Sequence, residues 1–457
     1  HPLDFVYLTS LRGRELARHA VPSYAARGRP DLSPEGACHC PQIYFDPILA
    51  RHVRGLPGVA LRYDTVLSSF EEIDGAVRAT LVDSRSGREE TVDADFLVGC
   101  DGTAGMVRDA LGIALAGEGI VADSVNIFFR SPELPSCHDK GWARFYRSID
   151  ATGCWSELIP IEGRELWRLT VFDEKGPACA AADYLDRMAG GNFPREIISV
   201  SRWERRDCVA TSYRHGRVFI AGDAAHQCSP TGGLGMHMGV EEAVNLAWKL
   251  AAVLAGWGGE GLLDSYETER RPVALAYVAM ATTAFRAIAE IPGLARESEA
   301  AVGAYIGARL RGFSVGDEAK IGYDYQPSPI CTDAARAEGA PPRPGPLRPG
   351  PLRPGLRAPH AWLADGRSIL DLFGRGFVLL RFADEPASAM LAAARSRGVP
   401  LIDAFIAEDR IASQYGARFV LVRPDGHVAW FGDSFPADAG ALVDRARGAV
   451  SALSARH

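Results

Sequence analysis

The sequence has no surplus of positive charge. Its 50 Lys and Arg residues stand against 57 Asp and Glu residues, which leaves a formal net charge of -7. Nucleic-acid-binding chains usually concentrate basic residues, so this composition predicts no nucleic-acid partner. No apolar run reaches the roughly 20 residues that a membrane-spanning helix requires. We therefore also expect no membrane partner.

Cysteine is sparse and irregular. The nine cysteines are odd in number and scattered, so the sequence predicts no disulfide framework and favours a reducing, cytoplasmic location. Cys38, His39 and Cys40, and the pair Cys137-His138, are metal-ligand residue types. Their spacing matches no standard zinc pattern and no second cluster accompanies them, so we predict no metal site.

Proline, by contrast, is concentrated between Pro341 and Pro359, where the unit Pro-Leu-Arg-Pro-Gly occurs twice in a row. Proline at this density disfavours helices and sheet ladders and favours an extended polyproline II conformation. We interpret 336–357 as a semi-rigid linker, with a proline-rich ligand for a partner protein as the alternative.

The chain alternates strand and helix signals after this linker. GFVLLRF is a buried-strand run, ASAMLAAARSRG is a helix ending at Gly398, and ARFVLVRPDGHVAWFG is a hairpin about Pro424-Asp425-Gly426. A closing amphipathic helix completes a compact α/β unit over 358–457. That unit contains no cysteine, which excludes thiol–disulfide chemistry there.

The chain before the linker mixes both signals. Strand-like stretches fill 59–100, and 120–205 is rich in strands, including a hairpin that turns at Glu162–Arg164. From Gly239 onward the spacing of apolar residues predicts a helix. The apolar residues at helical spacing are Val240, Val244, Ala247, Ala251 and Leu254.

The clearest chemical signal is the stretch VFIAGDAAHQCSPTGGLGMHMG. A buried strand that stops at Gly222-Asp223 puts the carboxylate at the strand's carboxyl end, where open α/β sheets bind ligands. The glycines that follow leave backbone amides bare before a helix N-terminus, which favours a negatively charged group. A flat, electron-accepting ring whose reduced form is an anion, such as a flavin, suits this site. The alternative is an ordinary turn that Asp223 caps.

These residues carry a family resemblance. The stretch GDAAH…PTGGLGM…AVNLAWKL resembles the second FAD-binding motif of the para-hydroxybenzoate hydroxylase-like aromatic monooxygenases. LVGCDG, at 97–102, resembles that family's Asp-Gly motif near the FAD pyrophosphate and the NAD(P)H path. CPQIYFDPIL resembles the stretch whose Gln reaches FAD, and LVRPDGHVAWFG resembles the thioredoxin-like domain of the phenol and polyketide hydroxylase branch.

The resemblance implies an α/β (α+β) fold class with three domains. An FAD-binding domain of the glutathione-reductase-like type, with C-terminal helices, would occupy 1–111 and 211–335. A β-rich substrate-binding domain would occupy 112–210, and a thioredoxin-like domain without cysteines would occupy 358–457. Phe128, Phe145, Trp155 and Trp167 of the middle domain suit a flat substrate or could equally form its core.

The resemblance also implies roles for individual residues. Asp223 would bind the ribityl hydroxyls, Gly222 would permit close approach, and Pro230 would line the cavity between flavin and substrate. Main-chain groups of Gly233, Leu234, Gly235 and Met236 would face the pyrimidine edge of the ring. Gln42 would lie by the ribityl and phosphate region, and Asp101 with Gly102 would form the Asp-Gly motif. A surface role for Gln42 and a loop-holding role for Asp101 remain alternatives.

The sequence departs from the family in several places. Members commonly have Asn where His237 stands and Asp where Glu242 stands. His215 and His226 are candidate acid–base groups, with a structural role as the alternative, and no G-x-S-x-G elbow supports a hydrolase.

The larger departure concerns the family's opening βαβ unit with its G-x-G-x-x-G loop, which this chain lacks. The only literal match, Gly256 to Gly261, ends a helix instead of following a strand. The first residues, HPLDFVYLTS, contain no signal-peptide core and no initiator methionine. We therefore expect an N-terminally truncated chain, with a defective FAD binder as the alternative.

The function that the resemblance implies is hydroxylation of a phenol or polycyclic polyketide with NADPH (or NADH) and O2, through a flavin C4a-hydroperoxide. This chemistry needs no side-chain nucleophile, and no catalytic residue is assigned. One rival is an FAD-dependent reductase, dehydrogenase or halogenase of the same fold, although the halogenase W-x-W-x-I-P stretch is missing. The other rival is a truncated chain that cannot hold FAD. Monomer and homodimer both stay open.

Overall fold

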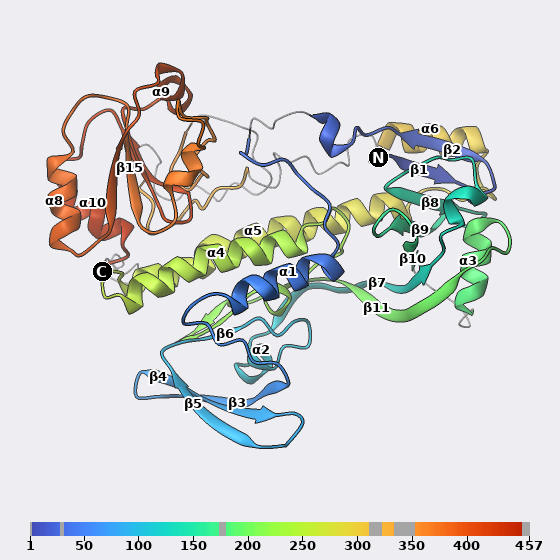
Figure 1. Ribbon diagram of the computed structural model, residues 1–457, viewed down its shortest axis with the longest axis horizontal. Coiled ribbons are helices and arrows are strands. Elements are labelled where there is room, and N and C mark those ends of the chain that lie inside the picture. The colour runs from blue at the N-terminus through green and yellow to red at the C-terminus, as the bar shows by residue number, and fades with distance from the viewer. Residues whose placement is uncertain (1, 28–31, 173–179, 310–321, 333–351, 450–457) are drawn as a thin grey trace.

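The computed structural model describes residues 2–27, 32–172, 180–309, 322–332 and 352–449. The largest sheet of this part of the chain lies at the right of Figure 1 and has eight strands in the order β14-β11-β7-β10-β9-β8-β1-β2. In that order the strands are His226–Gln227, Glu196–Ala210, Leu115–Arg130, Leu166–Phe172, Cys154–Pro160, Phe145–Ile149, Phe5–Leu8 and Glu15–His19. The predicted hairpin around Gly163 is confirmed as β9 and β10.

One face of this sheet is covered by helix α3 (Ala181–Ala189). Alternate side chains of the strands, such as Val6, Ile127 and Trp167, pack with Leu185 of α3 into a buried core. Because side chains of a strand alternate between faces, the intervening residues lie on the opposite face. That opposite face is only partly covered, by the end of helix α5 and by helix α6.

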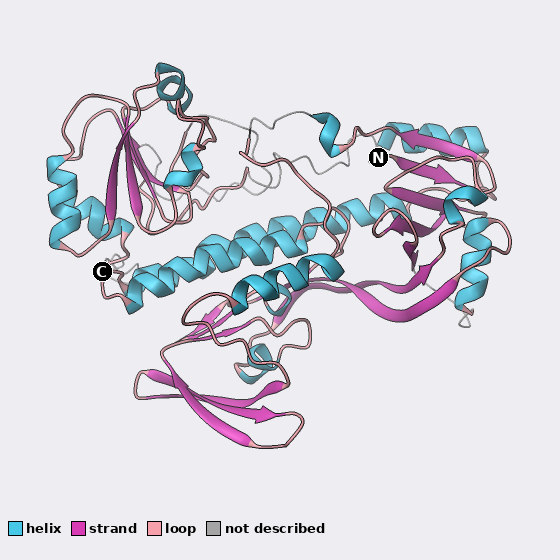
Figure 2. Cartoon of the chain, in the orientation of Figure 1, coloured by secondary structure: helices cyan, strands magenta, loops and turns pink. Residues whose placement is uncertain are grey.

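Strands β7 and β11 continue beyond the sheet as a long antiparallel ribbon, which Figure 2 shows running to the middle of the molecule. The register of the ribbon shifts between Asp207 and Cys208. Gly117, opposite this shift, has a φ of +146°, and a Cβ there would lie 2.1 Å from the Asp207 carbonyl oxygen. Glycine is therefore required for the two strands to stay paired.

The first two strands lie at the edge of the eight-stranded sheet. Residues 1–111 were assigned to the FAD-binding domain, yet β1 pairs in parallel with β8 and antiparallel with β2 at the edge of the eight-stranded sheet. The four-residue pattern of β1 predicts a strand but not the sheet that the strand joins, because its partner strand, Phe145–Ile149, lies more than 130 residues away in the chain.

Two three-stranded sheets form the lower lobe of Figure 1. The first has the order β12-β13-β6, with Arg214–His215, Val218–Ile220 and Leu97–Gly99, and β13 runs parallel to β6. The second is a meander of β3, β4 and β5, with Thr65–Ile73, Ala76–Asp83 and Glu89–Ala94. Helix α2 (Met106–Ala110) follows β6. The strands predicted in 59–100 are confirmed.

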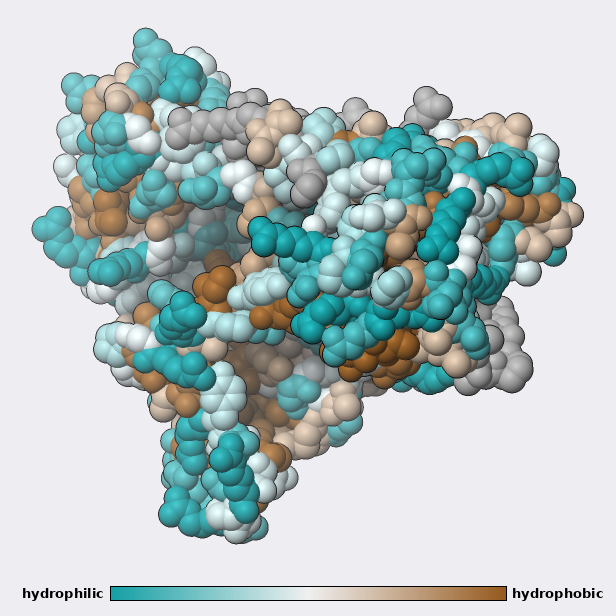
Figure 3. Space-filling model, turned by 45° about the vertical axis from the view of Figure 1, so that its right-hand side comes forward, coloured by the Kyte–Doolittle hydropathy of each residue, from teal (hydrophilic) through white to brown (hydrophobic). Residues whose placement is uncertain are grey.

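Helix α1 (Gln42–Arg54) has no buried residue in the described structure. Several large apolar side chains on α1, on β6 and on the first half of helix α4 are exposed, and Figure 3 shows apolar surface gathered in the hollow above the lower lobe. They include Ile43, Tyr44, Ile48, Leu49, Val98, Met236, Val240 and Val244. Strand β6 pairs only with β13 among the described strands, so its other edge is open.

Three helices follow the lower lobe: α4 (Gly235–Leu254), α5 (Glu260–Ala289) and α6 (Glu299–Arg309). Helix α4 begins four residues earlier than the predicted start at Gly239. Its apolar stripe from Val240 to Leu254 is exposed, whereas Glu242, Asn245 and Lys249 are fully buried together with apolar residues of the same face. The predicted helix is thus confirmed, but its buried face carries polar side chains.

Helix α5 is the one described helix that is long and apolar enough to cross a membrane by length and composition, a finding that the sequence analysis did not anticipate. Of its most apolar window, 56% is buried inside the molecule. It packs against α4 and against β9, β11 and β14. A core helix passes the same length and composition test, so this evidence for a membrane segment is weak.

The C-terminal domain is a four-stranded sheet of order β16-β15-β17-β18 with helices on both faces. Its strands are Leu401–Phe405, Phe377–Arg381, Phe419–Val422 and Val428–Gly432, and its helices α8, α9 and α10 are Ser388–Ser396, Asp409–Tyr415 and Ala439–Ala446. The strand, helix and hairpin predicted here are confirmed. In the part of the chain that the structure describes, short 3-10 turns occupy Tyr24–Arg27, Leu134–Cys137, Gly222–Ala224 and Ile369–Leu372.

Most of the linker predicted at 336–357 lies outside the described residues. Its described end packs against the rest of the chain: Arg353 forms an ion pair of 2.7 Å with Asp324, and Gly355 accepts a backbone hydrogen bond from Tyr325.

Candidate cofactor and substrate site

Strand β13, in the sheet of β12, β13 and β6, is followed by a glycine and an aspartate. Val218, Phe219 and Ile220 are buried, and the chain leaves the strand through Gly222, whose φ is +62°. No atom lies within 4 Å of the place where a Cβ of Gly222 would stand. Only glycine adopts this conformation without strain, and the space beside it is open to a ligand.

Asp223 follows at the carboxyl end of the strand, as predicted. Its side chain is exposed, and among the described residues it accepts no hydrogen bond and forms no ion pair. The capping role that we kept as an alternative is therefore not observed in this part of the chain. A carboxylate held at a strand end without a protein partner is available for the hydroxyl groups of a ligand.

Glu242 of helix α4 stabilises the Gly222-Asp223 turn. Its buried carboxylate accepts a hydrogen bond of 2.8 Å from the Gly222 amide and lies 3.0 Å from Nε2 of His226, which is also fully buried. The structural role considered for His226 is confirmed. The longer Glu side chain, where the family has Asp, reaches both groups from the first half of α4.

The loop from Pro230 to Gly235 leads into α4. Gly233 has a φ of +67° with open space beside it, while the Leu234 side chain is buried and anchors the loop. No side chain caps the N-terminus of α4, so its first amides stay free to face an electron-rich ligand. His237 is exposed and its Nδ1 lies 2.7 Å from the Gly233 carbonyl oxygen, so it braces the loop.

The Asp-Gly loop lies beside the Gly222-Asp223 turn. Arg108 is buried and donates to the carbonyl oxygens of Thr103 at 3.1 Å and Ala224 at 3.3 Å, and so ties the two loops together. Asp101 accepts a hydrogen bond of 2.9 Å from the Val107 amide. The loop-holding alternative for Asp101 is therefore observed, and it leaves the second carboxylate oxygen without a hydrogen bond from the described residues.

Gln42 is the first residue of α1, which lies in front of α4 and α5 in Figure 1. Its side chain is exposed and makes no hydrogen bond to the described residues. Cys38 and Cys40 are exposed on the loop before it, and no three His, Cys, Asp or Glu side chains of the described chain converge as metal ligands would.

These features fit one half of FAD. The open glycine cradles, the unpartnered Asp223 carboxylate and the uncapped N-terminus of α4 suit the ribityl chain and the pyrimidine edge of an isoalloxazine. Among the described residues, no G-x-G-x-x-G loop follows a strand to support the adenylate half, and one edge of β6 is open.

The site continues toward the eight-stranded sheet at Ser229, the residue before Pro230. Its hydroxyl lies 3.1 Å from Nη1 of Arg205, whose Nε donates to the Ser124 hydroxyl at 3.0 Å. Arg205 comes from β11 and is almost fully buried. Its two contacts link the loop of residues 229–235, which we call the flavin loop after the cofactor predicted there, to the eight-stranded sheet.

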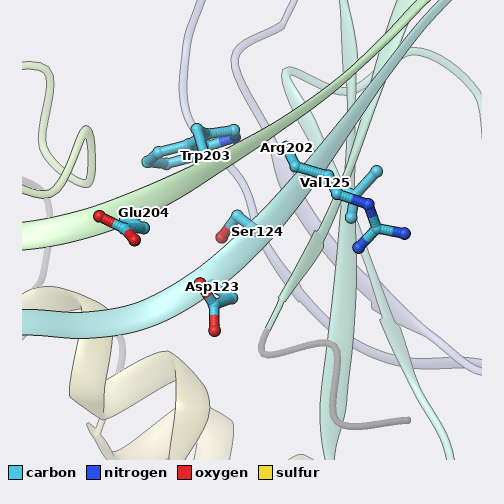
Figure 4. A pocket seen from close by; sticks show the side chains of 6 residues that line it. All are labelled: Asp123, Ser124, Val125, Arg202, Trp203 and Glu204. Carbon is cyan, nitrogen blue, oxygen red and sulfur yellow. The ribbon is translucent and has the colours of Figure 1, made fainter. Parts of the chain in front are cut away.

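A cavity of about 450 Å³ opens on the β7–β11 ribbon, and Figure 4 shows the side chains around it. It is lined by Asp123, Ser124, Val125, Arg202, Trp203 and Glu204. Two of these, Ser124 and Trp203, also contact Arg205. The volume lies in the range of sites for small aromatic molecules.

The four aromatic residues suggested for the substrate divide between the two faces of the sheet. Trp155 and Trp167 belong to the core beneath α3. Phe128 and Phe145 are partly exposed, and the strand alternation places them on the opposite face.

Sequence reasoning missed Arg108, Glu242 and Arg205 as residues that position the site. Of these three residues, only Glu242 stands out in the sequence, because members of the family commonly have Asp at that position. The two arginines reach partners 116 and 24 residues away in the chain, and no local pattern records such contacts.

Known proteins resemble this chain along most of its length. The model of an FAD binding domain matches residues 12–281, and that of the C-terminal domain of aromatic-ring hydroxylases matches 352–451. A putative polyketide hydroxylase of Streptomyces halstedii is 35% identical over 435 residues, covering 87% of this chain and 75% of that protein. The tetracenomycin B2 monooxygenase-dioxygenase of Streptomyces olivaceus is 33% identical, covering 97% and 83%.

Solved structures agree as well. RebC with bound 7-carboxy-K252c, from crystals soaked with chromopyrrolic acid, matches with a TM-score of 0.90 and 39% identity, covering 98% of this chain and 86% of that one. The ternary complex of aklavinone-11 hydroxylase with FAD and aklavinone matches with a TM-score of 0.78 and 30% identity, covering 97% and 85%.

Proposed function

The chain belongs to the FAD-dependent aromatic-ring hydroxylases, and from this membership we propose that it hydroxylates a fused-ring aromatic compound. It is an oxidoreductase of the monooxygenase class, with FAD as cofactor and NAD(P)H as electron donor. The observation that carries the proposal is the continuity of the flavin loop with the substrate sheet through the contact between Ser229 and Arg205. We also propose a cytoplasmic location, which the scattered cysteines support.

The relatives and the volume of the cavity both support a substrate with several fused rings. The relatives include a polyketide hydroxylase and the tetracenomycin enzymes, and one solved neighbour holds aklavinone. The cavity of about 450 Å³ has room for fused rings. Trp203, which lines the cavity, offers a flat surface of the kind on which such rings stack.

Asp223, Gly222 and the loop from Pro230 to Met236 would hold the ribityl chain and the pyrimidine edge of FAD. Gln42 would lie by the ribityl and phosphate region, and the Asp101-Gly102 loop would lie near the pyrophosphate. Bound FAD supplies electron transfer and the activation of O2. Glu242 and Arg108 keep the two loops in place through the Gly222 amide and the Ala224 carbonyl, so they act as positioning residues.

The protein itself would bind the aromatic substrate, orient it and exclude water from the site. Phe172 and Phe285 pack against the Arg205 guanidinium, with 5.1 and 4.5 Å from its central carbon to the ring centroids. Apolar walls of this kind would shield the reacting atoms from solvent. No side-chain nucleophile is required.

Turnover tests the proposal directly. The purified chain is supplied with excess FAD, NADPH and a hydroxylated naphthalene, and the product is analysed by mass spectrometry for one added oxygen atom. We expect faster NADPH consumption when the aromatic compound is present, together with a hydroxylated product. NADPH consumption that yields only hydrogen peroxide favours the reductase alternative, and the absence of FAD binding favours the chain that cannot hold its cofactor.

A further inference from the structure

A hairpin of the C-terminal domain, between β17 and β18, contacts the long helices α4 and α5 at the centre of Figure 1. Asp425, at the turn of this hairpin, has a side chain that is 1% exposed. It accepts hydrogen bonds of 3.1 Å from Nε1 of Trp248 and of 3.5 Å from Nδ2 of Asn245, which both belong to α4. The hairpin is therefore attached to the middle of α4.

Tyr325 extends this contact toward the start of α4. Its ring packs against His427 of the hairpin, with 4.3 Å between the two ring centroids, and the central guanidinium carbon of Arg423 lies 5.1 Å from the same ring. The Tyr325 amide donates to the carbonyl oxygen of Gly355, at the beginning of the C-terminal domain. Tyr325 is buried, so the domain determines where its hydroxyl lies.

Arg270 of α5 connects this hydroxyl to the first turns of α4. Its Nη1 donates to the Tyr325 hydroxyl at 3.3 Å. Its Nη2 donates to the Glu241 carboxylate at 2.9 Å and to the Met238 carbonyl oxygen at 3.4 Å. The guanidinium is fully buried, and its Nε has no partner among the described residues. Because a buried charge is costly without hydrogen-bond partners, Arg270 holds the acceptors that it has.

Met238 is also bonded to the flavin loop. Its amide donates to the carbonyl oxygen of Leu234 at 3.0 Å, and the Leu234 side chain is fully buried. The start of α4 is thus held on one side by the loop and on the other by Arg270. In the proposed function, main-chain groups of this same loop and helix start face the pyrimidine edge of the flavin.

We propose that the C-terminal domain is a working part of the flavin site, because its hairpin positions the start of α4 through Tyr325 and Arg270. The inference rests on the proposed function, since it concerns how the same site holds its flavin. It gives a role to a domain whose lack of cysteine excludes thiol–disulfide chemistry. Neither Tyr325 nor Arg270 is assigned a contact with the flavin, so both are positioning residues.

A matched pair of tyrosine variants tests the proposal. Tyr325→Phe removes the hydroxyl that accepts from Arg270 and keeps the ring that packs on His427. Tyr415→Phe removes another buried tyrosine hydroxyl, which donates to the Pro359 carbonyl oxygen at 2.7 Å within the C-terminal domain. The affinity of the full chain for FAD is measured by flavin fluorescence. We expect Tyr325→Phe to weaken it by between about threefold and thirtyfold, and Tyr415→Phe to leave it within about twofold.

Hydrogen–deuterium exchange of the flavin-free chain measures the start of α4 directly. The amides from Met238 to Glu242 are bonded within the first turns of the helix. Their exchange should become faster in Tyr325→Phe, because these turns lose a contact that holds them, and should be unchanged in Tyr415→Phe. Exchange in β3, β4 and β5 is the internal reference, since none of the contacts described above reaches those strands.

A double-mutant cycle tests whether the hairpin acts through Tyr325. His427→Leu removes the ring that packs on Tyr325 from the side of the domain and should also weaken FAD binding. If both changes interrupt one route, the double variant should bind FAD no more than about twofold more weakly than the weaker of the two single variants. Thermal melting checks that each variant is folded. If His427→Leu is not folded, Tyr325→Phe and its exchange measurement carry the test.

Unchanged affinity for FAD in a folded Tyr325→Phe variant would overturn the inference, as would equal losses in Tyr325→Phe and Tyr415→Phe. Fully additive losses in the double variant would also overturn it, because the hairpin would then act by another route. If the wild-type chain binds no FAD, the proposed function fails and the exchange measurement decides alone. Faster exchange at the start of α4 in Tyr325→Phe would then support the positioning role, and equal exchange would refute it.

Discussion

Arg423, in the hairpin of the C-terminal domain, forms a two-pronged ion pair with Glu269 of helix α5. Its Nη1 and Nη2 lie 2.6 and 2.9 Å from the two carboxylate oxygens, and both side chains are fully buried. Lys249 of α4 adds a contact of 2.7 Å, and Ser328 donates to the same carboxylate at 2.6 Å. The C-terminal domain is therefore joined to α5 and, through the contact of Lys249 with Glu269, to α4, which begins where the flavin loop ends.

Removing the charge of Glu269 should destabilise the whole chain. The Glu269→Gln variant would leave Arg423 and Lys249 buried without their shared anion, which costs about 3–5 kcal/mol. Urea denaturation measures this loss. The control is Glu290→Gln, at the exposed end of α5, where the ion pair with Arg309 is open to solvent and worth under about 1 kcal/mol. Equal effects of the two substitutions would contradict the role assigned to Glu269.

The same cluster predicts a dependence of stability on pH. Burial opposes the effect, but Arg423 and Lys249 lower the pKa of Glu269 from 4.5 to about 2. A carboxyl group with a lowered pKa in the folded state stabilises the fold above its unfolded pKa, and this contribution is lost as the pH falls toward 2. Denaturation experiments between pH 7 and pH 3 should show a steeper loss for the wild-type chain than for Glu269→Gln. Parallel curves would refute this assignment.

Asp223 should matter for flavin binding and little for folding. Because its carboxylate has no partner among the described residues, Asp223→Asn should leave the melting temperature nearly unchanged. Loss of a charged hydrogen-bond acceptor should weaken flavin affinity roughly tenfold, as measured by the fluorescence of the bound flavin. Asp95→Asn, a change of an exposed acid just before β6, is the control. A large drop in stability without a change in affinity would contradict the binding role.

FMN and FAD should bind with similar affinity if the described residues contact only the half that the two molecules share. The glycine cradles and Asp223 lie at the ribityl and ring positions, whereas the open edge of β6 offers no phosphate loop. We expect dissociation constants within about tenfold, which corresponds to 1.4 kcal/mol. Binding of FAD that is a hundredfold tighter than that of FMN would mean that the adenylate half has contacts which the described residues do not reveal.

The exposed apolar stripe of α4 should tolerate polar substitution. Val244 is 51% exposed, so Val244→Ser should change the free energy of unfolding by no more than about 0.5 kcal/mol. Leu246, two residues later, is 3% exposed, and Leu246→Ala should cost about 2–5 kcal/mol. Chemical denaturation of both variants makes the comparison. A larger loss at Val244 than at Leu246 would mean that the opposite face of α4 is buried.

Much of the site could be predicted because its signals are local. The buried strand, Gly222 and Asp223 are adjacent in the chain, and the backbone conformation of each depends mainly on its own residue type and its neighbours. The same holds for the C-terminal hairpin, where Gly426 has the positive φ of +77° that the turn requires. The roles of Asp223, Gln42 and the loop toward FAD remain predictions.

The sequence by itself determined the elements and the flavin loop: a strand that ends in Gly-Asp, bare glycine amides and a long helix follow from residue types and their spacing. Only the tertiary structure decided that α4 buries Glu242 and Lys249 and exposes its valines, and that β1 joins β8. The reason is physical. A polar side chain can be buried only when its partner is present, and these partners come from segments far away in the chain.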